Sequence, residues 1–150
     1  MNHRTATPLA ILFLAATLLA ACADTTDTPE APPEPAETTE VRVFFIQPTD
    51  QAAVSDSLTV VMGAEGLDIL PAGTMQENSG HMHILIDTDF IAPGQVIPND
   101  AQHLHYGTGA LEAELVLTPG PHTLRLQLAD GAHIALDGPQ YRDEINITVE

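Results

Sequence analysis

The stretch "LEAELVLTPGPHTLRLQL" (residues 111–128) is the clearest guide to the fold, because it contains two strand patterns and the turn between them. Leucine or alanine recurs at every second position on both sides of "TPGP", with polar or charged residues at most of the positions between. This period of two is typical of a strand that rests one face on a hydrophobic core. The Pro-Gly pair supplies the special backbone angles of a tight turn. The stretch therefore predicts antiparallel β-structure.

The same apolar, strand-like character continues on both sides of this stretch, and no segment has a convincing helical period. Short strands separated by Pro, Gly and Asp turns are typical of an antiparallel sandwich. Six or seven such strands in about 110 residues predict an all-β, immunoglobulin-like antiparallel β-sandwich. The further predicted strands are residues 41–48, 57–65, 81–87 and 145–149.

The N-terminal part predicts export and lipidation. Residues 1–21 combine a short positive start with an apolar run, which is typical of a signal peptide. They end in "LAAC", which resembles the lipobox of bacterial lipoproteins and implies cleavage before Cys22 and lipidation of that residue. The alternative is an ordinary secretory signal with an incidental cysteine. Ala23 follows the cysteine where aspartate would signal inner-membrane retention, so we expect an outer-membrane lipoprotein facing the periplasm.

Residues 22–40 are rich in proline and acidic side chains and cannot form a core, so they predict a disordered tether behind the lipidated cysteine. The folded domain is then residues 41–150. The chain has a formal net charge of −17 and no lysine, which excludes nucleic acid as a partner. The acidic surface suits cations, although solubility alone also explains most of it. The membrane, through the lipid anchor, is the one partner that the sequence predicts, and a protein partner stays unknown.

Two His-x-His pairs are the candidate chemical groups: "HMH" at 81–83 and "HLH" at 103–105. Residues i and i+2 of a strand point to one side, about 7 Å apart at Cα, so each pair can converge on one cation. The second pair lies in residues 88–110, a long connection without clear alternation. Leu85 shares the outward face of His81 and His83, so we expect this connection to fold over that face and bring His103 and His105 to the first pair.

All-imidazole sites suit Zn²⁺ or Cu²⁺, and free histidine is mostly neutral at pH 7. We therefore predict a copper or zinc site formed by His81, His83, His103 and His105, with Met75 and His133 as lower-ranked ligands. Acceptors for the other ring N–H groups are expected among Asp87, Asp89 and Asp100. The alternative is a buried polar network in which the histidines only pin the long connection.

Enzyme signatures are missing: the sequence has no nucleophile elbow, no zinc-protease motif and no phosphate-binding loop. Metal-assisted hydrolysis with an acidic residue as base therefore ranks third, below a metal-binding domain and a non-catalytic envelope interaction module. His122 is read as structural, because it shares the strand face of Leu124 and is expected to point inward directly after the Pro-Gly turn.

Four segments together resemble a secreted bacterial domain catalogued as a domain of unknown function (number 4399): "VFFIQPTDQAAV", "SGHMHILIDTD", "IPNDAQHLHYGTG" and "LTPGPHTLRLQLADGAH". The resemblance covers about residues 43–149 and implies an immunoglobulin-like periplasmic domain without an established activity. The family's pattern falls on His81, His83, His103, His105, His122, Asp130 and His133. The chain departs from it at Tyr106, where phenylalanine is expected, and at Met82, where a third histidine is frequent.

Overall fold

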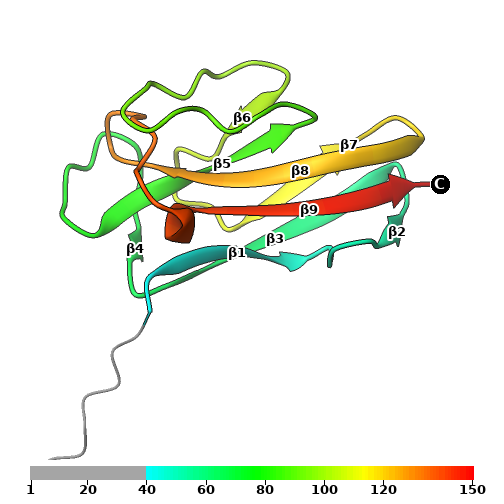
Figure 1. Cartoon of the computed structure of the whole chain (residues 1–150), viewed down its shortest axis with the longest axis horizontal. Helices are drawn as coiled ribbons and strands as arrows, with labels where there is room; N and C mark the ends of the chain where they lie inside the picture. Colours follow the sequence, from blue (N-terminus) through cyan, green and yellow to red (C-terminus); the bar gives the residue numbers. More distant parts are fainter. Residues whose placement is uncertain (1–39) are drawn as a thin grey trace, which may run out of the picture. The chain divides into compact units, whose positions relative to one another are not determined.

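The computed structural model describes residues 40–150, which form two facing β-sheets (Figure 1). The predicted signal peptide, the lipidation of Cys22 and nearly all of the predicted tether lie outside these residues. Within residues 40–150, no helix combines the length and the apolar character that crossing a membrane requires.

The first sheet has three antiparallel strands in the order β1-β3-β7. Alternating burial identifies its inner face: Val60 of β3 and Leu115 of β7 are buried, while Glu114 between the inward residues of β7 is exposed. The strands are β1 (Arg42–Gln47), β3 (Ser57–Glu65) and β7 (Glu112–Val116).

The second sheet has the order β2-β9-β8-β5-β4, and β6 also pairs with β5. Its longer pairings are antiparallel, and the two-residue pairings of β2 with β9 and of β4 with β5 are parallel. One turn of 3₁₀-helix, η1 (Pro139–Tyr141), precedes the last strand. The strands are β2 (Ala53–Val54), β4 (Asp68–Ile69), β5 (Ser79–Ile86), β6 (His103–His105), β8 (Gly120–Ala129) and β9 (Arg142–Val149).

This strand order confirms the predicted all-β sandwich. Among strands of three or more residues, the first, second and fifth form one sheet and the third, fourth, sixth and seventh form the other, as in immunoglobulin-like domains. The core lies between the sheets, where the even-numbered residues of β5 and β8 meet β3 and β7. Met82, Ile84, Leu124, Leu126 and Leu128 are completely buried there.

The "TPGP" turn joins strands of different sheets. β7 belongs to the first sheet and β8 to the second, so the two alternating strands that flank the turn do not pair with each other. Gly120 has φ +130°, a conformation that side chains rarely adopt. The turn therefore carries the chain across the end of the sandwich.

The long connection after β5 covers the outward face of the second sheet. It contains β6, and its Ile97 is buried against Ala129 and Ala135 in a second, small apolar cluster. Gln127, an outward residue of β8, is completely buried because its side-chain amide bonds both the N–H (2.9 Å) and the C=O (2.7 Å) of Ile91. The second sheet is thus buried on both faces at this point.

Candidate metal centre

Four histidine rings gather between the second sheet and the loops that cover it. His81 and His83 come from β5, His105 from β6, and His133 from the loop after β8. The ring centroids lie 4.7–5.0 Å apart in five of the six pairs, and the His83 and His133 centroids are 6.1 Å apart. We call these four residues the histidine cluster.

Strand register explains why these segments meet. His83 lies directly opposite His105 in the β5–β6 pairing, so both side chains point to the outward face. On the other side of β5, His81 lies opposite Ala129, the last residue of β8. The loop that follows Ala129 therefore brings His133 next to His81.

The ring nitrogens of the cluster point at one another. Nε2 of His83 lies 3.1 Å from Nε2 of His81, and Nε2 of His133 lies 3.2 Å from Nε2 of His105. His81, His105 and His133 each offer one ring nitrogen within 4.8 Å of the other two. Two nitrogens bound to one tetrahedral ion at about 2.0–2.1 Å would be about 3.3 Å apart, so the 3.1 Å and 3.2 Å spacings each fit two ligands of one ion. They also fit N–H···N hydrogen bonds between neutral rings.

Burial keeps the inner half of the cluster neutral. His81 and His83 are completely buried, and His105 and His133 are half-buried. Burial, followed by repulsion from the neighbouring histidines, lowers the pKa of His81 to about 4 and that of His83 to about 3. The pKa of His105 is lowered for the same reasons. Neutral imidazole is the form that binds metal ions.

Two of the buried rings also have an unused nitrogen. The Nδ1 atoms of His81 and His83 have no hydrogen-bond partner among residues 40–150. An unpartnered polar atom in a protein interior is costly and uncommon. The four rings are therefore not a fully satisfied polar network.

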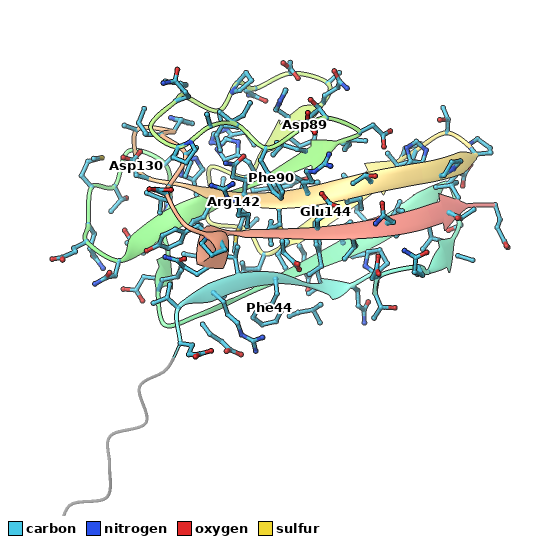
Figure 2. All side chains as sticks on the ribbon, in the orientation of Figure 1. Phe44, Asp89, Phe90, Asp130, Arg142 and Glu144 are labelled. Carbon is cyan, nitrogen blue, oxygen red and sulfur yellow. The ribbon has the colours of Figure 1, made fainter. Side chains whose placement is uncertain are left out.

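The charge of Asp130 partly opposes the lowering of the His81 pKa, but Asp130 does not bond to any of the rings. Its Oδ1 instead accepts hydrogen bonds from the backbone N–H groups of Ala132 (2.8 Å) and Ile134 (3.0 Å). Figure 2 shows Asp130 in the loop after β8, at the end of the sandwich where β5 begins. The carboxylate thus belongs to the turn that carries His133.

The predicted ligand His103 lies outside the cluster. It is opposite Leu85 on the outward face, but its Nδ1 is 2.8 Å from Oδ1 of Asp100, three residues earlier in the chain. The same oxygen accepts the backbone N–H of Gln102 and of His103. The predicted ligand set and the observed cluster therefore differ in one residue: the cluster contains His133 and not His103.

The three predicted carboxylate acceptors lie apart from the cluster. Asp100 bonds His103, and Asp87 bonds Nδ1 of His122 at 2.7 Å. The exposed Asp89 lies 3.8 Å from Nη2 of Arg125. In Figure 2, Asp89 neighbours Phe90, whose ring centroid is 5.5 Å from the guanidinium carbons of both Arg125 and Arg142. These aspartates hold loops and arginines rather than cluster rings.

Met75, the other lower-ranked ligand, has 70% of its surface exposed, on the loop between β4 and β5. Its sulfur lies beside Gly131, because a Cβ at that glycine would be 3.0 Å from it. Met75 is therefore next to the turn that carries His133, with most of its surface exposed. The sequence "DGAH" pointed to His133, since aspartate and glycine indicate a turn two residues before this histidine.

Comparison with known proteins places the chain in a family. A solved structure titled "Structures of Clostridium thermocellum CbhA fibronectin(III)-like modules" is similar at 16% identity and a TM-score of 0.40, over 72% of this chain and 95% of that one. No curated protein matches the sequence. A family model described as Domain of unknown function (DUF4399) matches residues 60–150, more than half of the chain. The resemblance is thus confirmed for the three segments that lie within residues 60–150, and the protein belongs to the DUF4399 family.

Proposed function

We propose that this domain binds one copper or zinc ion through the histidine cluster, with His81, His83, His105 and His133 as ligands. The observation that carries the proposal is the convergence of four imidazoles from three separate segments, with ring nitrogens 3.1–3.2 Å apart in two pairs. A cation would replace the two weak ring-to-ring contacts with bonds to nitrogens that already face inward.

The donor set supports copper or zinc over harder cations. The cluster presents nitrogen donors, and none of the carboxylates of residues 40–150 bonds to its rings. Mg²⁺ and Ca²⁺ prefer oxygen ligands, whereas imidazole suits Zn²⁺ and Cu²⁺. The formal charge of −17 favours the approach of any cation to the domain.

The proposed role is binding rather than catalysis. A hydrolytic metal site needs a base beside the metal-bound water. Asp130, whose charge acts on the pKa of His81, already accepts two backbone N–H groups with its carboxylate. The family and the sandwich fold fit a non-catalytic module.

A second candidate is a non-catalytic envelope interaction module in which the histidines are structural. One observation favours it: the 3.1 Å and 3.2 Å contacts are within hydrogen-bond range without any metal. The unpartnered Nδ1 atoms of His81 and His83 count against it, because a structural network should satisfy its buried polar atoms. Metal binding separates the two candidates.

The metal experiment is a titration of the purified full-length protein with Cu²⁺ and Zn²⁺, followed by calorimetry. We expect one ion per chain with a dissociation constant below about 1 μM. The double variant His105→Ala/His133→Ala should weaken binding at least about 100-fold, because it removes two ligands. His103→Ala is the matched control, since it removes a histidine of the same strand outside the cluster. Binding weaker than about 10 μM in the unaltered protein, or equal affinity in the double variant, would end the metal proposal.

We also propose that the protein is a lipoprotein, anchored through Cys22 to the outer membrane and facing the periplasm. The support is the "LAAC" sequence after an apolar run and the acidic, proline-rich segment that follows. Cys22→Ser should move the protein from the detergent-extracted membrane fraction to the soluble periplasmic fraction. A protein that stays soluble with Cys22 intact would contradict the anchor.

A further inference from the structure

The half-buried pair of the cluster, His105 and His133, depends on residues that are not ligands. His81 and His83 are held by β5, a central strand paired along most of its length. His133 lies in a loop, and His105 is the last residue of the three-residue strand β6. We infer that Asp130 and Gly107 are positioning residues of the metal site, which set the rings of His133 and His105; this inference rests on the proposed metal binding.

Asp130 builds the turn that presents His133. Its Oδ1 accepts two backbone N–H groups, its C=O accepts the N–H of His133 (3.0 Å), and its own N–H donates to the C=O of Ile134 (3.0 Å). These four hydrogen bonds close a loop of five residues, and two of them depend on the Asp130 side chain. An aspartate or asparagine oxygen is suited to this pattern.

The turn holds His133 in an unfavourable backbone conformation. His133 has φ +66°, in the left-handed region, which a residue with a side chain adopts only at a cost in free energy. Without the two bonds to the Asp130 carboxylate, the backbone at 133 would relax toward negative φ and the ring would leave its place, 4.7 Å between centroids from the His105 ring. Asp130 thus acts on the site through His133.

The loop between β4 and β5 packs against the turn that carries His133. The backbone N–H of Gly73 donates to the C=O of Gly131 (2.8 Å), and a Cβ at position 131 would overlap the carbonyl oxygen of Thr74. The same loop reaches the His105 segment, because the N–H of Ala72 donates to the C=O of Gly107 (2.9 Å). One loop therefore bridges the two segments that carry the half-buried pair.

Gly107 places the His105 ring by having no side chain. The ring of His105 lies across Gly107 so closely that a Cβ there would overlap Cε1 and Nε2 of the ring. Nε2 is the atom that faces His133. Because Gly107 does not have the left-handed φ that disfavours side chains, Gly107→Ala displaces the ring without straining the backbone.

The test compares Asp130→Ala with Asp130→Asn in the full-length protein. Asparagine keeps an Oδ1 acceptor for the turn but removes the charge, so it separates positioning from electrostatics. We expect Asp130→Ala to weaken Cu²⁺ and Zn²⁺ binding at least about 10-fold and Asp130→Asn to stay within about threefold of the unaltered protein. Asp89→Ala is the control for a lost surface charge and should also stay within about threefold. Equal affinity in Asp130→Ala, or an equal loss in Asp130→Asn, would overturn the role.

Gly107→Ala tests the second residue and should also weaken binding at least about 10-fold, with the neighbouring exposed Thr108→Ala as control. Copper electron paramagnetic resonance should show fewer nitrogen donors in Gly107→Ala and Asp130→Ala, a change that a merely less stable fold would not produce. Unchanged affinity and donor number in Gly107→Ala would remove it from the site.

A metal-free measurement keeps the inference separate from the proposed function. In the metal-free protein, nuclear Overhauser contacts between the His105 and His133 rings should be present in Asp130→Asn and absent in Asp130→Ala and Gly107→Ala. Ring contacts that persist in both alanine variants would contradict the positioning role, whatever the metal titration shows. Loss of metal binding in the unaltered protein, with these contacts behaving as expected, would instead end the proposed function alone.

Discussion

The six histidines of residues 40–150 fall into two groups that differ in their partners. His103 and His122 each bond an aspartate, at 2.8 Å and 2.7 Å. The ring nitrogens of the histidine cluster come within hydrogen-bond distance only of one another among residues 40–150. All six lie on or beside the same sheet, so the difference arises from local contacts rather than from general position.

Each histidine of the first group ties one segment to another. Asp100 also accepts two backbone N–H groups around His103, and Asp87 also accepts the N–H of Thr123 beside His122. The second ring nitrogen of His122 bonds the C=O of Thr118 at 2.8 Å. His122 thus uses both ring nitrogens in the fold, and His103 uses Nδ1, while its buried Nε2 has no hydrogen-bond partner among residues 40–150. The cluster rings, without a carboxylate, keep lone pairs that a cation can use.

The largest expected effect is loss of stability of the metal-free protein in mild acid. His81 and His83 have native pKa values of about 4 and about 3, below the ordinary 6.5. Between pH 6.5 and these values, the unfolded chain takes up protons that the folded state does not, so stability falls as the pH falls. We expect about 2 kcal/mol lost per buried ring between pH 7 and pH 5, measured by urea denaturation.

The matched variants for this experiment are His81→Gln and His103→Asn. The first removes a buried titrating ring and should flatten the dependence of the unfolding free energy on pH between 7 and 5. The second removes a ring outside the cluster and should leave the slope steeper than in His81→Gln. If the unfolding free energy depended equally on pH in the two variants, protonation of the buried cluster histidines would not be the cause of the acid sensitivity.

A smaller effect is expected when His103 is removed. His103→Asn should lower stability by about 1 kcal/mol, because it breaks the partly buried hydrogen bond between the ring of His103 in β6 and Asp100. Its metal affinity should stay within about threefold of the unaltered protein. Urea denaturation measures the stability and calorimetry with Zn²⁺ measures the affinity. A loss of affinity as large as that of His105→Ala/His133→Ala would move His103 back into the site.

The smallest effect concerns His122, where the sign is reversed. The hydrogen bond to the Thr118 carbonyl, aided by Asp87, raises the pKa of His122 above its ordinary value. Its contribution to stability is therefore fully present below the unfolded pKa near 6.5 and is lost as the pH rises through the native pKa. Asp87→Asn should lower the pKa of His122 in a proton NMR titration. An unchanged midpoint would remove Asp87 as a cause.

Strand periodicity predicted much of this arrangement, because alternation reports which face of a strand is buried. It placed Met82 and Ile84 in the core and left His81 and His83 on the other face, as the structure has them. The cover over Leu85 was also inferable, since an outward apolar residue needs one. Each of these inferences needs only the sequence of one strand, because alternation alone assigns its residues to two faces.

The membership of the cluster could not be read from periodicity, because it depends on turns and on strand register. His103 and His105 share a face, yet only His105 lies opposite His83. His133 reaches the site through a turn closed by Asp130 and a left-handed backbone, which no alternation pattern reports. The expected acceptors Asp87, Asp89 and Asp100 are near the histidines in sequence, but turns and strand register place them beside other groups.

The most direct test of the central claim is a histidine side-chain NMR titration of the full-length protein with Zn²⁺. Ring ¹⁵N resonances would be recorded for all histidines as one equivalent is added. We predict large ¹⁵N shifts for His81, His83, His105 and His133 and small shifts for His103 and His122. Unchanged cluster resonances, or the largest shifts at His103 and His122, would contradict the division of the histidines into a metal-binding cluster and two fold-bound rings.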